Sequence, residues 1–521
     1  MSKPIESFFD NEYKSNVMWL PPTGCYTIAQ HDIMFQGPLF KVSNRTGQLK
    51  ERYFVLTEDN LFYLKSEKKP KILSVMPLKW VRVDYLIKSA SGHETSFCFR
   101  FIRNMRFTDL FTDSEEFFQA WRLNLSKIVL QCDFHSKFQT IKMIGKGSFA
   151  RVYLVENKET KERFAVKAFS KEYLLSQSKG KESLINEIEI MQKLKHPYIM
   201  CLEEVHESKN SVYLVLELLE GGELLNHISN NSSISMGEVG RIMFYILDAL
   251  SYMNSKGIMH RDLKPDNMIL KEKDKKEGFT LKLVDFGLAT VHNIPEYLFK
   301  RCGTPGFVAP EVINAPSNEN IHYEPKCDVF SAGVIFYILL TEKSPFDGAS
   351  FKEILQKNKQ CRVDFKHPKL KKNKLALELL VKMLEVDPAK RISAEEALSE
   401  RFFKEMERDL GFGDGGSLLS NTYSNVYKNP LRLNRGNEKD MGSFVVRDNL
   451  ITGNTRTVNE SLNSRGLISS FRNVNNRNTP SDLSSKRESI LKYVLVQNAN
   501  QNNDGIYDSG FVNEVFDSDC E

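Results

Sequence analysis

Residues 260–267 read HRDLKPDN, and this stretch decides the fold of the 521-residue chain. It places a histidine, an arginine, two aspartates, a lysine and an asparagine within eight positions. The apolar run LKLV leads into VDFG at 284–287, and CGTPGFVAPE follows at 302–311. Upstream, IGKGSFARVYLV at 144–155 predicts two strands joined by a glycine hairpin, in which backbone N–H groups can approach phosphate oxygens. Taken alone, such a hairpin is more readily explained as an ordinary β-turn.

A lysine and a glutamate lie between this hairpin and the HRDLKPDN stretch. FAVKAF at 164–169 predicts an alternating strand that carries Lys167, and a lysine on a buried strand needs an anionic partner. SLINEIEIMQKL at 183–194 predicts a helix that can supply this partner through Glu187. Because chance does not produce all of these motifs in this order, we interpret them together.

In this order the motifs resemble those of the protein kinase family, over about residues 138–404. The resemblance implies a bilobal fold that uses ATP and Mg²⁺, in which the protein positions groups and neutralises charge. It implies that Asp262 accepts the proton of the substrate hydroxyl, that Lys264 neutralises the γ-phosphate, and that Thr304 contacts the aspartate. The remaining charged roles fall to Lys167 with Glu187, at the α- and β-phosphates, and to Asp285 and Asn267, as magnesium ligands. None of these groups is missing, so we expect an active kinase; the alternative is an inert kinase-fold adaptor that binds membranes and partners.

The same resemblance places the adenine between apolar walls. Val152 and Ala165 would form the roof, Ile269 the floor, and the backbone of Glu217 and Leu219 would bond the adenine edge. The full set expected to bind the nucleotide is Ile144, Gly145, Gly147, Val152, Ala165, Lys167, Leu216, Glu217, Leu219, Glu223 and Ile269. The third glycine of the loop is replaced by Ala150, which is small enough for the same turn.

Other motif residues are expected to be structural. Met191, Leu202, His260 and Phe286 fall where this family stacks a column of side chains between the lobes, so packing is favoured over catalysis for His260. The stretch 328–346 resembles the long helix of the C-terminal lobe, and its Asp328 would brace the catalytic loop. In DPAKRISAEEAL at 387–398, Arg391 would pair with Glu311.

The motifs also indicate substrate and regulation. DLKPDN and Thr304 before a proline are typical of serine/threonine kinases. Glu223 and Asp266 favour protein substrates with a basic motif, although Glu223 could instead meet the ribose hydroxyls. The activation segment has Lys300 where many kinases carry a threonine, and a lysine cannot pair with Arg261. We therefore expect regulation from outside this segment; the C-lobe motifs are most similar to the calcium/calmodulin-dependent kinase group.

Residues 33–131 precede the kinase-like region and are rich in strands. GPLFKVSNRTGQLKERYFVLTEDNLFYLK at 37–65, with a terminal helix over 114–129 that carries Trp121, resembles a pleckstrin-homology (PH) domain: a bent seven-strand barrel capped by a helix. Its first hairpin is expected to bind phosphoinositide headgroups at a membrane surface, through Lys41, Arg45, Lys50 and Arg52. The alternative is a solvated basic hairpin.

The order of the two regions is similar to that in protein kinase B. That group carries an F-x-x-F tail motif and an activation-loop threonine, and this chain has neither, so we do not assign it there. Only about six residues separate the two regions, which predicts that they contact each other and that lipid or tail binding shifts a closed form.

The whole chain is thus predicted as a multidomain α+β protein: an arm over 1–32, a PH-like β-barrel, a kinase domain, and a mostly disordered regulatory tail over 405–521. In the tail, residues 484–498 predict either an autoinhibitory or calmodulin-contacting helix or a short solvated helix. A net charge of +5 does not indicate nucleic-acid binding. Scattered cysteines, no signal peptide and no long apolar stretch favour a cytoplasmic protein that is recruited to a membrane surface.

Overall fold

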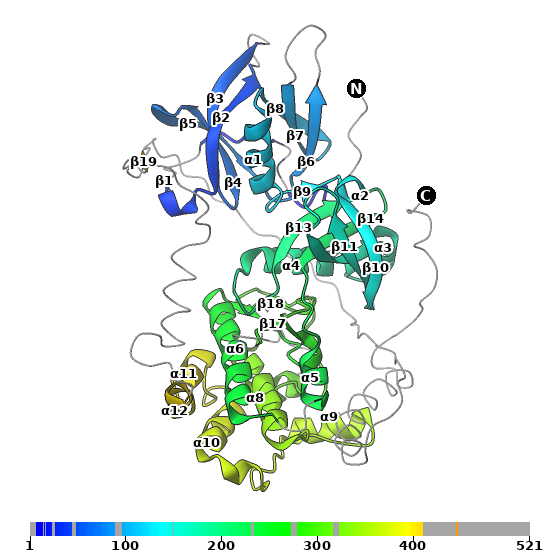
Figure 1. Cartoon of the computed structure of the whole chain (residues 1–521), viewed down its shortest axis with the longest axis vertical. Helices are drawn as coiled ribbons and strands as arrows, with labels where there is room; N and C mark the ends of the chain where they lie inside the picture. The colour runs from blue at the N-terminus through cyan, green and yellow to red at the C-terminus, as the bar shows by residue number, and fades with distance from the viewer. Residues whose placement is uncertain are drawn as a thin grey trace.

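Figure 1 shows the computed structural model, which describes residues 7–13, 15, 17–22, 27–43, 48–88, 96–147, 149–230, 234–271, 279–315, 322–409 and 444–445. Three bodies follow one another along the chain: a strand-rich domain with one long helix, a smaller strand-rich lobe, and a helical lobe. The predicted tail therefore lies outside the described residues, apart from 405–409 and 444–445. Arg45 and the segment 484–498 also lie outside them.

The first domain is a curved antiparallel sheet of seven strands, as predicted. The strands, in the spatial order β6-β7-β8-β2-β3-β4-β5, are β6 (Arg82–Lys88), β7 (Ser96–Arg103), β8 (Arg106–Thr112), β2 (Phe35–Val42), β3 (Leu49–Leu56), β4 (Asn60–Ser66) and β5 (Lys69–Pro77). The helix α1 (Glu115–Leu125) covers the sheet, buries Trp121 completely, and ends earlier than the predicted residue 129. A Cβ at Gly37 would lie 2.2 Å from the ring of Phe117, so any larger residue at this position in β2 would require that ring to move.

The second body is a five-stranded sheet with two helices. Its strands are β10 (Phe138–Lys146), β11 (Ala150–Asn157), β12 (Arg163–Ser170), β14 (Ser211–Glu217) and β13 (Leu202–Glu207), in this spatial order. The helices α3 (Lys171–Ser176) and α4 (Gly180–Lys193) connect β12 to β13, and a short α2 (Phe134–Lys137) precedes β10.

A two-residue strand joins the first two sheets. The strand β9 (Leu130–Gln131) pairs in parallel with β6 on one side and with β13 on the other, so Leu130 lies opposite both Arg82 and Val205. The result is a continuous sheet of thirteen strands (Figure 1). The short connection predicted contact between the two domains, and the structure shows it; the linking strand itself was not predicted.

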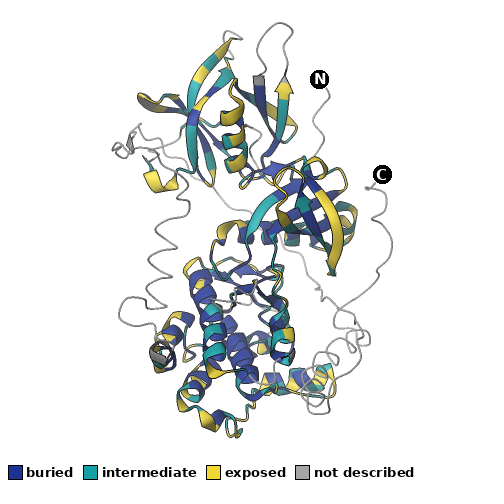
Figure 2. Ribbon diagram, viewed as in Figure 1, coloured by how far each residue is buried: buried dark blue, intermediate teal, exposed yellow. Residues whose placement is uncertain are grey.

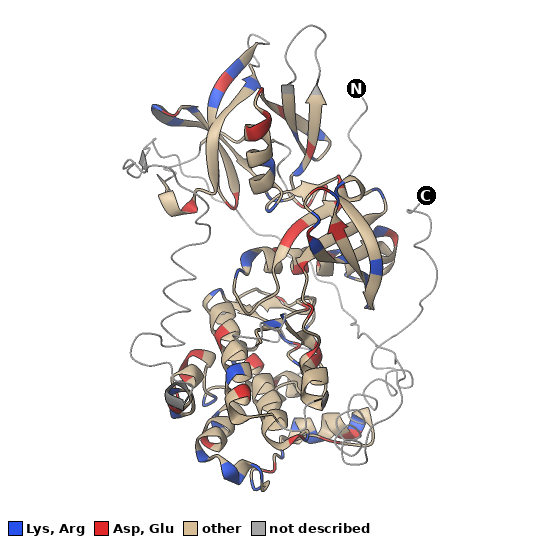
Figure 3. Ribbon diagram, viewed as in Figure 1, with Lys and Arg blue, Asp and Glu red and all other residues tan. Residues whose placement is uncertain are grey.

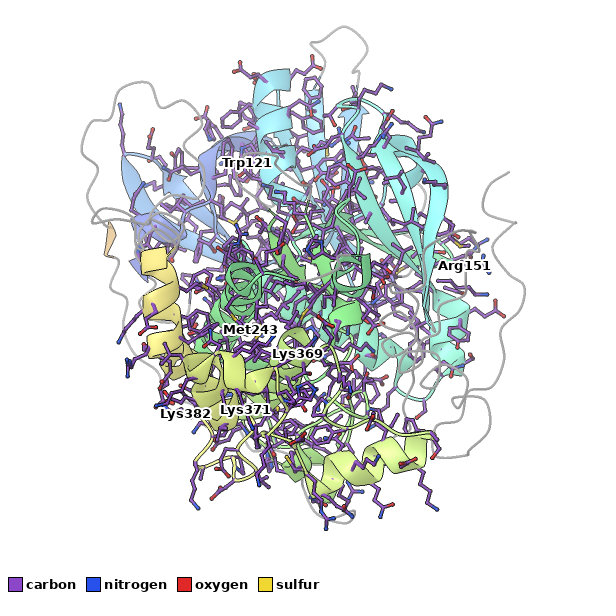
Figure 4. The ribbon with its side chains drawn as sticks, turned by 60° about the horizontal axis from the view of Figure 1, so that its bottom comes forward. Trp121, Arg151, Met243, Lys369, Lys371 and Lys382 are labelled. Carbon is purple, nitrogen blue, oxygen red and sulfur yellow. The ribbon has the colours of Figure 1, made fainter. Side chains whose placement is uncertain are left out.

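The third body is helical and carries the catalytic motifs on its upper edge. Its helices are α5 (Leu224–Asn230), α6 (Met236–Ser255), α7 (Pro310–Asn314), α8 (Lys326–Thr341), α9 (Phe351–Gln360), α10 (Lys374–Met383), α11 (Ala394–Leu398) and α12 (Arg401–Asp409). Short strands β15 (Ile258–Met259), β16 (Met268–Leu270), β17 (Leu281–Leu283) and β18 (Thr290–Val291) pair as β15-β18 and β16-β17. The helices α6 and α8 are mostly buried (Figure 2), and Met243 of α6 lies in the interior of this lobe (Figure 4).

Two local features differ from the expectation. The helix expected over 328–346 ends at Thr341, because Glu342 adopts a left-handed conformation (φ 61°) and its N–H caps the carbonyl of Ile338. The strand β1 (Thr27–Ile28), in the predicted arm, pairs with β19 (Phe444–Val445), in the predicted tail. No helix in the described part of the chain is long and apolar enough to cross a bilayer.

Candidate active site

The HRDLKPDN stretch forms a loop between β15 and β16, and one buried aspartate fixes it. The carboxylate of Asp328, at the start of α8, accepts hydrogen bonds from the backbone N–H groups of His260 (2.7 Å) and Arg261 (2.8 Å). His260 is completely buried, its ring packs 5.0 Å from that of Phe286, and its Nε2 lies 3.2 Å from the carbonyl oxygen of Val284. His260 is therefore a packing residue, as the sequence favoured.

Asp262 lies at the centre of a small network of hydrogen bonds. The hydroxyl of Thr304 donates to Asp262 Oδ1 (2.6 Å), and Lys264 Nζ lies 3.0 Å from Oδ2. The ammonium of Lys264 also donates to the Thr304 hydroxyl (2.9 Å), so each of these three side chains contacts the other two. Asn267 donates its amide N–H to Asp262 Oδ2 (3.1 Å) and to the Asp262 carbonyl (2.9 Å). This arrangement holds one carboxylate in a fixed orientation at the front of the loop.

A lysine bridges two carboxylates above this loop. Lys167 Nζ, on β12, lies 2.7 Å from Glu187 Oε1, on α4, and 3.2 Å from Asp285 Oδ1, directly after β17. Burial alone would lower the pKa of Lys167, but attraction to Asp285 and Glu187 outweighs it, so the lysine stays charged. The same lysine lowers the pKa of Asp285 to about 2. Burial raises the pKa of Glu187, against the pull of Lys167.

The expected nucleotide-binding residues lie on adjoining strands. The register of the sheet places Gly145 opposite Val152, Val152 opposite Lys167, and Ala165 opposite Leu216. An isolated bridge joins Glu223 to Ile269, which brings the expected floor beside the segment after β14. Leu219 is partly buried in the same segment. The hairpin turn is tight, since Gly147 N–H donates to the carbonyl of Ala150 at 2.8 Å.

Two glutamates after β14 have different surroundings. The Glu217 side chain turns into the protein, where it accepts from Lys282 Nζ (2.5 Å) and from the Cys201 N–H (2.7 Å). Its backbone N–H donates to the Cys201 carbonyl at 3.2 Å, and the role expected for its backbone at the adenine edge stays a prediction. Burial raises the pKa of Glu223, and the charge of Asp266 adds to the effect. Burial likewise raises the pKa of Asp266, so these two carboxylates form a partly buried acidic pair that would gain from a cation.

Arg261 is held by neutral acceptors. Its guanidinium donates to the carbonyls of Leu288 (2.7 Å) and Phe299 (2.7 Å) and to the hydroxyl of Tyr323 (2.9 Å). Lys300 instead lies 3.2 Å from Glu296 within the activation segment. The segment therefore contacts Arg261 through uncharged carbonyl groups, and regulation from outside the segment stays a prediction.

The other predicted structural residues also lie where expected. Met191 and Phe286 are buried in the core cluster of the kinase region, and Leu202 packs against it. The guanidinium of Arg391 is completely buried and bonds both oxygens of Glu311, at 2.6 and 2.9 Å. This pair is far from the catalytic loop in sequence and joins α7 to the segment before α11.

The residues present fit a magnesium–nucleotide complex. Asp285 keeps a half-exposed, ionised carboxylate (49% exposed), and the amide nitrogen of Asn267 is used by Asp262, which leaves its oxygen as the group to ligate a cation. No group of three or more His, Cys, Asp or Glu side chains suited to a metal occurs among the described residues. Magnesium in phosphate-transfer sites commonly takes only one or two protein ligands besides the phosphates, so this pair suffices.

The basic hairpin of the first domain is a separate cluster. Lys41 on β2 lies directly opposite Lys50 on β3, and Arg52 lies on the same face as Lys50. Arg52 donates to the hydroxyl of Tyr63 (3.1 Å), and burial lowers the pKa of Lys41, whose ammonium lies 5.6 Å from the ring of Trp19. Figure 3 shows that charged residues concentrate on β3. The structure thus brings together the three described members of the predicted lipid site.

Sequence reasoning missed two features near the site. No sequence pattern predicts the ion pair between Lys282 and Glu217, since Lys282 lies within an apolar strand. The segment Ser7–Tyr13 packs between the two domains, although it was read only as an arm; its paired phenylalanines, Phe8 and Phe9, were an available signal.

Comparisons with known proteins agree with this geometry. The chain matches the family "Protein kinase domain" over residues 138–403, about half of its length, and the family "PH domain" over residues 33–129. A PH domain thus precedes a protein kinase domain in this chain.

Several relatives are similar over the kinase region. Calcium-dependent protein kinase 4 of Plasmodium falciparum (isolate 3D7) is 37% identical over 274 residues, which is 52% of this chain and 50% of the relative. Myosin light chain kinase A of Dictyostelium discoideum is 36% identical over 265 residues, or 50% of this chain and 86% of the relative. Probable serine/threonine-protein kinase 2 of Plasmodium falciparum (isolate K1 / Thailand) is 38% identical over 273 residues, or 52% and 51%. The chain spans about half the length of the Plasmodium relatives named here.

Proposed function

Because this chain belongs to the protein kinase family, we propose that it transfers the γ-phosphate of ATP to serine and threonine hydroxyls of proteins. The observation that carries the proposal is the hydrogen-bonded carboxylate of Asp262, held by Thr304 and Lys264 beside the Lys167–Glu187 ion pair. These contacts support a phosphoryl-transfer site at the catalytic loop.

In this proposal each residue positions a group or balances a charge. ATP bound with magnesium would supply the phosphoryl group, and Asp285 and Asn267 would hold the metal. Asp262 accepts a hydrogen bond from the substrate hydroxyl, orients it, and holds its proton as the new bond forms. Lys264 lies close enough to Asp262 to balance the charge at the transferred group.

The test is a transfer assay with radiolabelled ATP, magnesium and mixed protein substrates. Wild type is expected to label serine and threonine, and Asp262→Ala is expected to lose about 10²–10⁴-fold in rate, the usual contribution of a positioned base. An unlabelled substrate and no autophosphorylation with wild type, despite normal ATP binding, would favour the inert adaptor instead.

The substrates are proposed to carry a basic motif near the target hydroxyl. Glu223 and Asp266 support this because burial raises the pKa of both carboxylates, and the charge of Asp266 adds to the shift of Glu223. A positional peptide array should show selection for arginine or lysine upstream of the target, and Asp266→Asn should weaken it. If Glu223 serves the ribose instead, Glu223→Gln will raise the KM for ATP and leave the peptide preference unchanged.

The PH domain is proposed to recruit the protein to phosphoinositide-containing membranes. The support is the like-charged face of Lys41, Lys50 and Arg52, which would bind two or three phosphates in one hairpin. The full chain should sediment with vesicles that contain phosphatidylinositol phosphates more than with phosphatidylcholine vesicles. Equal sedimentation with both would identify the hairpin as merely solvated.

Regulation by calcium–calmodulin is a further part of the proposal. The printed names of some relatives, such as calcium-dependent protein kinase 4, mention calcium, while the segment 484–498 that could contact calmodulin lies outside the described residues. Activity of the full chain should differ with and without calcium–calmodulin, and equal activity would contradict this regulation.

A further inference from the structure

The segment Ser7–Tyr13 connects the kinase domain and the PH domain. At one end, Ser7 Oγ and the Phe8 N–H both donate to the carboxylate of Glu207, each at 2.6 Å. At the other end, Asp10 Oδ1 accepts from the Asn104 N–H of the PH domain (2.8 Å). The segment is thus bonded to both domains at once.

Glu207 provides a binding site for this segment. It is buried, and its Oε1 also accepts from Lys171 Nζ at 2.7 Å. Departure of the segment would remove two of the donors to this buried carboxylate, and a buried polar group that loses its partners carries a free-energy cost. The docked position is therefore specified by more than apolar contact.

The centre of the segment is an aromatic stack. Phe9 is 1% exposed, and its ring lies 4.6 Å from that of Trp80 with an angle of 4° between the planes. Phe9 and Trp80 belong to the same buried cluster as Leu184 and Ile188 of α4, whereas the PH core around Trp121 is a separate cluster. A tryptophan from the PH domain thus forms part of the kinase core.

Trp80, which packs into the kinase core, has an unusual backbone conformation. Its φ is 57°, in the left-handed region, which is costly for a bulky residue. Such strain persists only where the surrounding structure enforces it, and it concentrates at functional positions.

The helix α4 lies between this assembly and the active site. On its outer side, Lys181 pairs with Glu12 of the segment (2.7 Å), and Glu189 pairs with Lys79 of the PH domain (2.7 Å). On its inner side, Glu187 pairs with Lys167. At 3.6 residues per turn, Lys181 and Glu189 face away from Glu187, so the helix is fixed from opposite sides.

We propose that residues 7–12 act as an internal ligand of the kinase domain, in which Phe9 and Trp80 position α4 so that Glu187 can pair with Lys167. This deepens the proposed kinase function and rests on it. The PH domain and the arm would then support catalysis. A ligand that displaces Trp80 would lower activity through this helix.

The experiment is a double-mutant cycle in the full chain. Phe9→Ala is expected to lower kcat about tenfold, within the range typical of coupling between two sites, with little change in the KM for peptide. In a Glu187→Gln background, Phe9→Ala should have little further effect, because both changes act through the same ion pair. Independent, multiplying losses would overturn the proposal.

Further variants distinguish a positioning role from simple misfolding. Ser7→Asp places a second carboxylate against Glu207 without touching the core, and it should lower kcat as Phe9→Ala does, whereas Ser7→Ala should lower it less. Phe9→Leu and Trp80→Phe, which keep apolar side chains at the stack, should retain most of the wild-type activity that Phe9→Ala loses. Leu123→Ala, at an exposed position of α1, is the matched control and should leave kcat unchanged.

Hydrogen exchange separates this proposal from the kinase function itself. In Phe9→Ala the amides of α4 should exchange faster than in wild type, while those of α6 stay unchanged, whatever the catalytic result. Unchanged protection of α4 would overturn the positioning role. Absence of phosphate transfer by wild type would instead overturn the proposed function.

Discussion

The catalytic loop and the basic hairpin of the PH domain both gather charges, but they do so in opposite ways. Around the loop, both lysines contact an acid: Lys264 lies 3.0 Å from Asp262, and Lys167 lies 2.7 Å from Glu187. In the hairpin, Lys41 faces Lys50, and their neighbour Arg52 bonds a tyrosine hydroxyl and a carbonyl.

The difference indicates the function to which each charge arrangement is suited. A site built of paired charges keeps its geometry before the substrate arrives, so it is suited to positioning reacting groups. A face of like charges remains unneutralised until an anion binds, so it is suited to recruitment. Substitutions that remove one partner of an ion pair, or one cation of the basic hairpin, test this contrast.

The largest effect is expected where the most deeply buried charge loses its partner. Glu311→Ala leaves the completely buried guanidinium of Arg391 without its carboxylate, and the free energy of unfolding should fall by about 3–5 kcal/mol. Chemical denaturation measures the change. The control is Glu378→Ala, whose partner Lys374 is 88% exposed; its loss should stay below about 1 kcal/mol. Equal losses would contradict the argument from burial.

The next effect concerns the cation at the nucleotide. Lys167→Met leaves Glu187 and Asp285 without the lysine between them and should lower the rate of phosphate transfer by about 10²–10³-fold. Lys209→Met, at an exposed turn between β13 and β14, should be close to wild type. Initial rates at saturating ATP provide the comparison, and a loss confined to the KM for ATP would contradict a role in the transfer step.

Smaller effects are expected in the hairpin, where one substitution should weaken membrane binding and slightly stabilise the fold. Lys50→Ala should weaken binding to phosphoinositide vesicles by about 1 kcal/mol, the usual worth of one cation near an anionic surface. It should also stabilise the fold by a few tenths of a kcal/mol, because like charges directly opposite in a sheet repel. Lys127→Ala, an exposed lysine after α1, should change neither sedimentation nor the denaturation midpoint.

The smallest effect concerns pH. The pKa of Asp285 is lowered to about 2 in the folded protein, chiefly by Lys167, so the unfolded chain binds this proton more readily. Its stabilisation is present above the unfolded value of about 4 and is lost as the pH falls toward 2. The unfolding free energy should therefore drop more between pH 5 and pH 2 for wild type than for Asp285→Asn. The half-exposed carboxylate limits the size of the difference through solvent screening.

Much of the site follows from the sequence because its motifs are local. The HRDLKPDN stretch fixes Asp262, Lys264 and Asn267 within one loop, and their mutual contacts need only that the loop forms. The pairing of Lys167 with Glu187, twenty residues apart, followed from a strand next to a helix. The boundaries of the helices were less predictable, since α1 and α8 end at caps set by local backbone conformation.

The sequence alone determined the order of the two domains and the chemistry of the catalytic loop, because residue type and spacing specify both. Only the tertiary structure decided that β9 joins two sheets into one and that Phe9 stacks on Trp80 beside α4. These contacts join segments that are distant along the chain, and no local pattern encodes which surfaces meet. Burial of apolar area between the folded domains selects them, and that selection acts only once both domains have formed.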